Sequence, residues 1–241
     1  MRRTLALFLI LMATALAQQK SDEAVRLPAD TDKPEARLIE ENEHYRVLRF
    51  DLAGESQASV PQRRTDVIIV AFGDGLSLGS AKDANPEKLA DGDVRFFQRP
   101  VHPAILHSGD SVSETIVVEL KDHWDSEIRP CSQPKTCTHA IRVGGAEIGQ
   151  TISLFSNGFV TAYRHHMDRG GTLTTSYYSS KGKDHLLVVA LANLQANFDG
   201  TEQELKRGQV FASDASEVEM DAGSHEVSWV VIRVEVPKMP Q

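Results

Sequence analysis

The chain has 241 residues, with 26 Lys and Arg against 34 Asp and Glu, and a formal net charge of −8 with neutral His. This acidic balance argues against nucleic acid as a partner, because binding the phosphate backbone needs a basic face. Hydrophobic residues make up 41% and charged residues 25%. These values are typical of a chain that folds around a core, which argues against wholesale disorder.

The first residues, 1–17, have the layout of a secretory signal peptide. Arg2 and Arg3 precede an apolar stretch that begins at Leu5, and the small residues Ala15 and Ala17 end it. The stretch is shorter than the ~20 residues of a membrane-spanning helix. We therefore expect cleavage after Ala17, a periplasmic or secreted product, and no membrane span after cleavage. An uncleaved N-terminal anchor is the alternative.

The two cysteines, Cys131 and Cys137, lie close together in the sequence. In an oxidising compartment an even count at short spacing predicts a disulfide. A zinc knuckle and a pair of free thiols are the alternatives, although a zinc site needs a second pair of ligands.

The chain divides into a leader and two similar halves. Residues 18–41 are mostly polar and read as a loosely ordered leader. Residues 42–121 and 158–241 then show the same order of signals, and residues 122–157 connect them and carry the Cys pair. Glycines mark equivalent points of the two halves at a nearly constant offset.

Each half consists of short runs that alternate apolar and polar residues or are continuously apolar, such as 67–72 and 186–191. Gly, Pro and Asp separate the runs, and no stretch of residues 18–241 keeps a helical period. This pattern indicates an all-β chain of antiparallel sandwiches or barrels with few short helices.

The spacing of residues in the first half resembles a known family. Gly54 is followed after five residues by Val60, and then by Gln62, Asp66 and Gly73. This frame and the strand order resemble the cupin superfamily, and the two halves resemble a bicupin, over most of residues 42–120 and 158–237. The resemblance implies two tandem jelly-roll β-barrels. In many cupins this motif supplies two His and a Glu to a metal ion.

The metal-binding histidines of the family are missing. In the first half the third His position, counted from Gly92, holds Pro103. In the second half the two His positions and the Glu position hold Tyr177, Ser179 and Asp184, and the third His position holds Glu219. None of the six ligand-position histidines is present, so the resemblance predicts no metal cofactor of the usual cupin kind.

The same register offers Tyr177, Ser179, Asp184 and Glu219 as ligand-binding candidates, since it places Tyr177, Asp184 and Glu219 inside the second barrel. Two nearby carboxylates in a pocket form a general acid/base pair or an oxygen site for one divalent cation such as Ca²⁺. A hydrogen-bond network with Ser179 is the structural alternative. A register shifted by one residue would turn the carboxylates to solvent.

The remaining histidines offer one further metal candidate. His102 and His107 lie five residues apart around Pro103, and with Asp66 they could make a site. His165 and His166 are adjacent on an expected strand, so they should point to opposite faces and cannot chelate one ion together.

The sequence thus predicts an exported cupin-fold protein without the usual metal centre, acting as a small-ligand-binding or structural module. The alternative is an enzyme that uses Asp184 and Glu219, with or without a cation, on a sugar or small organic acid. Long β edges would allow a homodimer.

Overall fold

The computed structural model describes residues 36–59, 65–79, 85–99, 101, 103–121, 129–131, 137–157, 159–176, 182–214 and 217–237. All elements assigned in these residues are β-strands, and every strand pair is antiparallel. The all-β prediction is confirmed, and within the described part of the chain helical geometry is assigned to Cys137 alone. A helix long and apolar enough to cross a bilayer is absent from these residues.

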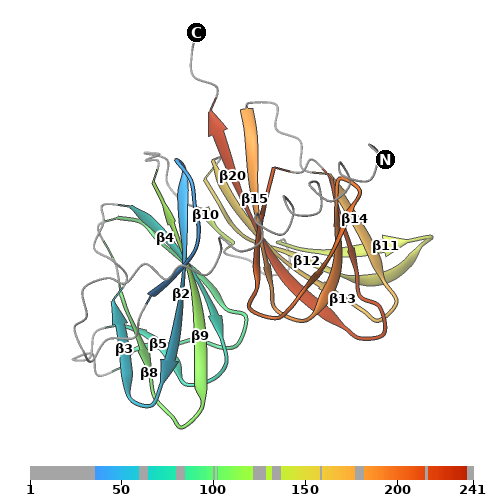
Figure 1. Cartoon of the computed structure of the whole chain (residues 1–241). Coiled ribbons are helices and arrows are strands. Elements are labelled where there is room, and N and C mark those ends of the chain that lie inside the picture. Colours follow the sequence, from blue (N-terminus) through green and yellow to red (C-terminus); the bar gives the residue numbers. More distant parts are fainter. Residues whose placement is uncertain are drawn as a thin grey trace, which may run out of the picture.

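The first half contains two sheets, which appear in blue to green in Figure 1. Sheet A has the order β1-β2-β9-β4-β7, with β1 (Ala36–Glu41), β2 (Tyr45–Ala53), β9 (Val112–Leu120), β4 (Asp66–Phe72) and β7 (Val94–Phe97). Sheet B has the order β3-β8-β5-β6, with β3 (Ser56–Ser59), β8 (Ala104–His107), β5 (Leu76–Gly79) and β6 (Glu87–Lys88).

The second half repeats this arrangement, in yellow to red in Figure 1. Sheet C has the order β10-β12-β13-β20-β15-β18, with β11 also paired to β12. Its strands are β10 (Arg129–Pro130), β11 (Thr138–Val143), β12 (Ala146–Ser156), β13 (Val160–Met167), β20 (Val227–Pro237), β15 (Gly182–Ala190) and β18 (Val210–Ser213). Sheet D has the order β14-β19-β16-β17, with β14 (Thr172–Ser176), β19 (Glu217–Asp221), β16 (Leu194–Phe198) and β17 (Thr201–Leu205).

The four sheets form four layers in the order B, A, C, D. One apolar cluster lies between sheets B and A, another between sheets C and D, and a third joins sheet A to sheet C. Because sheets A and C are covered on both faces, their central strands β4 and β15 can be apolar at almost every position. This explains the continuous apolar runs at 67–72 and 186–191. In a sheet with one solvent-exposed face, such strands would alternate apolar and polar residues.

The two halves use the same turn at equivalent glycines. Gly92 N–H donates to Ala71 O at 2.8 Å, and Gly208 N–H donates to Ala190 O at the same distance. Both glycines have left-handed backbone, with φ of 74° and 78°, which a side chain would disfavour. The glycine spacing in the sequence therefore marks a repeated backbone geometry.

A salt bridge joins equivalent positions of the two halves. Asp91 and Arg207 each precede their turn glycine, and Arg207 Nη2 lies 2.8 Å from Asp91 Oδ1. Partial burial opposes ionisation of Asp91, but the hydrogen bonds from Arg207 and the Gly73 N–H outweigh it and lower the pKa of that carboxyl. Equivalent positions of the two halves therefore meet across the junction between them.

Two boundaries expected from the sequence are wrong. Residues 36–41, assigned to the polar leader, form β1, whose Arg37 pairs with Asp51 at 2.6 Å. Strands β10 to β12, assigned to the connecting segment, belong to sheet C of the second half. Short polar strands at sheet edges carry little apolar signal, so composition alone misassigns them. The expected signal peptide lies outside the described residues.

The predicted disulfide is present between Cys131 and Cys137, whose Cα atoms are 6.1 Å apart. Cys131 follows β10 and Cys137 precedes β11, and both strands pair with the same edge of β12. The bond therefore holds two short strand segments in line along one edge of sheet C.

Replacing both cysteines by serine should lower the free energy of unfolding by about 2 kcal/mol. The loss is modest because the disulfide closes a short loop and so restricts the unfolded chain only slightly. Urea unfolding of the double variant, with and without reductant, measures this. A parent protein that loses no stability on reduction would contradict it.

Candidate functional site

Asp184 faces the interior of the second half. On β15 it alternates with Leu186 and Val188, which belong to the core between sheets C and D. The residue is only 9% exposed. The Asp184 side chain therefore lies on the face of β15 that points toward the core between sheets C and D.

Asp184 belongs to an ion cluster with two residues of β20. Arg233 Nε donates to Asp184 Oδ2 at 2.6 Å, and Arg233 Nη2 lies 3.2 Å from Glu235 Oε1. All three side chains are less than a fifth exposed. A buried guanidinium needs such counter-charges, because an unpaired charge in the interior is very costly. The arrangement gives Asp184 a structural partner.

The first half carries a similar buried pair at the same end of its interior. Arg46 on β2 and Glu119 on β9 are register partners, and Arg46 Nε donates to Glu119 Oε2 at 2.8 Å. They alternate with Leu48 and Val117, which lie in the core between sheets A and B. Glu119 is 1% exposed and Arg46 is 9% exposed. The interior of each half thus holds a buried ion pair among its apolar side chains.

Glu219 does not face the interior, which corrects the expected acid/base pair. Its strand neighbours Val218 and Met220 are both in the core between sheets C and D, so Glu219 points to the outer face of sheet D. Thr174 Oγ1 donates to its Oε2 at 3.2 Å. Asp184 and Glu219 therefore occupy different sheets and opposite faces. The position of Glu219 was inferred by counting residues from Gly208 across the turn before β19. An error of one residue in that count assigns the side chain to the opposite face of the sheet.

The metal candidates of the first half are also separated. Asp66 alternates with Ile68 and Val70, which lie in the cluster between sheets A and C, and its Oδ1 accepts the Arg99 N–H at 3.0 Å. His107 is buried in sheet B and its Nδ1 lies 2.7 Å from Gly54 O. The two are therefore on different sheets, and the expected grouping is wrong.

Three of the sequence candidates, His102, Tyr177 and Ser179, lie outside the described residues. Within the residues that are described, no three His, Cys, Asp or Glu side chains are grouped so that they could hold a metal ion.

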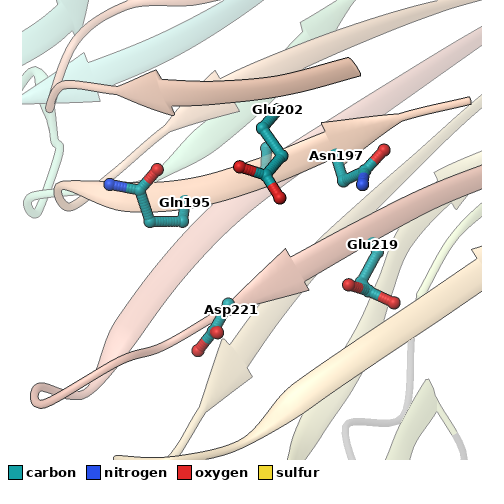
Figure 2. Close-up of a pocket in the computed structure, with 6 residues that line it drawn as sticks. Gln195, Asn197, Glu202, Glu219 and Asp221 are labelled. Atoms are coloured by element: carbon teal, nitrogen blue, oxygen red, sulfur yellow. The ribbon is translucent and has the colours of Figure 1, made fainter. Parts of the chain in front are cut away.

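The outer face of sheet D carries an open pocket of about 260 Å³ on strands β16, β17 and β19. Register pairs Asn197 with both Glu202 and Glu219, and Gln195 with Asp221, so these side chains leave the sheet on one side. Figure 2 shows the five labelled side chains around this hollow. The lining residues are Gln195, Ala196, Asn197, Glu202, Glu219 and Asp221.

The pocket combines three carboxylates with two carboxamides, which gives it negative charge and both donors and acceptors. Asn197 Oδ1 accepts the Gly200 N–H at 2.7 Å, and Asp221 Oδ1 accepts the Gly223 N–H at 2.7 Å. These bonds fix two of the side chains from the turns at the strand ends. The arrangement suits a small ligand that brings a positive charge and hydroxyl groups, and it repels an organic acid.

Of the six lining residues, only Glu219 was expected from the sequence, and the other five were not. The run Leu194–Phe198 alternates buried apolar and outward polar residues, so its outward face could have been read from period-2 spacing. The cupin motif positions instead indicated residues in the interior of the second half.

A second group missed from the sequence lies where the halves meet. The rings of His44 and His185 are 5.2 Å apart between centroids, and His185 Nδ1 lies 2.6 Å from Asp214 Oδ1. Burial, followed by the charges of Glu40 and Asp214, raises the pKa of neighbouring Tyr45 to about 12. These histidines lack any recognisable spacing, because only the packing of sheet A on sheet C brings them together.

Comparison with known proteins establishes the fold. No protein-family model and no curated protein matches the chain. Among solved structures, a cupin 2 conserved barrel domain protein from Leptotrichia buccalis is similar with a TM-score of 0.54 and 13% identity, covering 87% of this chain and 92% of that one. Salicylate 1,2-dioxygenase from Pseudoaminobacter salicylatoxidans is similar with a TM-score of 0.60 and 11% identity, covering 93% of this chain and 79% of that one. Vicilin from tomato, Solanum lycopersicum, is similar with a TM-score of 0.59 and 13% identity, covering 88% of this chain and 82% of that one.

The chain therefore has the cupin fold. Because a dioxygenase and a vicilin share it, the fold does not select a function, and the function must be argued from the site.

Proposed function

We propose that this chain is an exported bicupin without the imidazole metal centre, and that it binds a small amine-bearing, hydroxylated ligand on the outer face of sheet D. The signal-peptide pattern of residues 1–17 supports export. The observation that carries the binding proposal is the hollow in which Glu202, Glu219 and Asp221 lie beside two carboxamides.

The barrel interiors support the scaffold part of this proposal. In the described residues of both halves, the inward positions are occupied by the apolar clusters, by the pairs Arg46–Glu119 and Asp184–Arg233, and by a few other buried polar side chains, such as His107 and His165. An enzyme that uses Asp184 and Glu219 together loses its basis, since the two carboxylates lie on opposite faces. The exposed pocket remains the place where several polar side chains converge.

Binding is tested by calorimetric titration with three matched sugars: glucosamine, glucose and glucuronate. We expect glucosamine to bind, glucose to bind more weakly, and glucuronate not to bind, because the carboxylates attract the ammonium group and repel the acid. Equal responses to all three sugars, or no response to glucosamine, would overturn the binding proposal.

Changing Glu219 and Asp221 to Gln and Asn should weaken glucosamine binding by about ten-fold or more, since each change removes a charge-assisted hydrogen bond. The matched control is Glu226→Gln, an exposed carboxylate in the turn before β20. Both variants are compared with the parent by the same titration. An unchanged affinity in the double variant would place the ligand elsewhere.

A further inference from the structure

The interior of the second half contains a buried histidine that the proposed binding function does not use. His165 on β13 is 4% exposed. Its ring stacks on Trp229 of β20, with 5.0 Å between centroids and 16° between planes. The adjacent His166 points the other way, where its Nδ1 lies 3.0 Å from Ser228 Oγ. The expectation that the two histidines face opposite sides is confirmed.

The surroundings of His165 do not favour a charged imidazole. Its Nδ1 lies 3.0 Å from Thr151 Oγ1, while Nε2 is buried with no hydrogen-bond partner in the described part of the chain. The titratable groups nearest in register on its face are Tyr163, whose ring centroid lies 6.2 Å away on the same strand, and exposed His139 on β11, the register partner of Thr151. The cluster of Asp184, Arg233 and Glu235 lies on the same face, further along β15 and β20. The stacked partner Trp229 carries no charge. Burial lowers the pKa of His165 to about 4.

The first half has an apolar residue at the corresponding position. Phe50 on β2 is the register partner of Thr115 on β9, as His165 is of Trp229. Phe50 is 3% exposed and lies in the core between sheets A and B. Acid can therefore charge this position in the second half but not the equivalent position in the first, whose own buried histidine, His107, lies in sheet B.

We propose that His165 is an acid-sensitive latch: its protonation opens the second half around β12 and β13, while the first half stays closed. In the opened state the His165 imidazole is exposed to water and accepts a proton. In the closed state its packing against Trp229 disfavours the protonated form. An exported protein meets the pH of its surroundings, so such a latch would couple the state of one half to the medium.

The size of the effect follows from proton linkage. An exposed imidazole has a pKa of 6.5, against about 4 for His165 in the closed state. Above pH 6.5 neither state gains a proton at this site, so closing is unaffected. Between pH 6.5 and 4 the open state binds the proton and the closed state does not. The opening constant should therefore rise by about thirty-fold between pH 8 and pH 5.

Hydrogen exchange of the whole chain at pH 8 and pH 5, corrected for the intrinsic rate, tests this. Peptides from β12 and β13 should lose protection by about thirty-fold, and peptides from β2 and β9 should not. His165→Phe, which copies the first half, should remove the difference, and exposed His225→Asn should keep it. Equal loss in both halves, or an unchanged loss in His165→Phe, would overturn the proposal.

A measurement on the unaltered protein covers the case in which His165→Phe fails to fold. NMR titration of the imidazole Cε1–H signals should show one histidine that stays neutral at pH 5 in the closed state. If every histidine signal is protonated at pH 5 while the second half keeps its exchange protection, the latch does not exist.

Discussion

Glu119→Gln is expected to lower the free energy of unfolding by about 3–5 kcal/mol, the cost of removing one partner from a buried ion pair. Glu119 is 1% exposed, and its carboxylate receives the Arg46 guanidinium at 2.8 Å. The neutral amide leaves that buried cation without a counter-charge. Urea unfolding at pH 7, followed by circular dichroism, measures the loss.

Two controls isolate the ion pair. Replacing both partners in Arg46→Met/Glu119→Leu should restore most of the stability, because apolar side chains of similar size remove both charges together. Glu147→Gln breaks the exposed Arg142–Glu147 pair, 3.7 Å apart, and should cost less than about 1 kcal/mol. A Glu119→Gln variant no less stable than Glu147→Gln would show that the buried pair does not hold the first half together.

Asp184→Ala is expected to lower the free energy of unfolding by about 3 kcal/mol, for the same reason. The substitution removes the carboxylate that receives Arg233 Nε at 2.6 Å and leaves Glu235 as the partner given by the structure. Because Asp184 faces the core and the pocket lies on the outer face of sheet D, glucosamine affinity of the folded variant should equal that of the parent.

Glu219→Ala is the matched partner of this test, since it truncates an exposed side chain of the pocket. It should change the free energy of unfolding by less than about 0.5 kcal/mol and weaken glucosamine binding. Urea unfolding and calorimetric titration of both variants give a crossed result: one loses stability and the other loses binding. Loss of binding in a fully folded Asp184→Ala would move the ligand to the interior.

Much of the fold could be predicted from the sequence, for identifiable physical reasons. Gly92 and Gly208 need left-handed backbone at equivalent turns, so their spacing recorded the repeat. The runs 67–72 and 186–191 are apolar on both strand faces because sheets A and C are buried on both sides. Cys131 and Cys137 were paired from count and spacing. Each of these signals is local and depends on chain geometry more than on distant partners.

The site could not be predicted from the sequence to the same extent. Whether Glu219 points in or out depends on the residue count through one turn, and a slip reverses the face. The contact between His44 and His185 depends on how two sheets pack, which leaves no spacing pattern. The inward charges Arg46 and Arg233 occupy strand positions that composition alone would assign to solvent.

Elemental analysis of the purified protein tests the central claim most directly, because it shows whether either half retains the chemistry of a metal centre. We expect no iron, manganese or copper in stoichiometric amount with the chain. A stoichiometric transition metal that survives dialysis against chelator would contradict it.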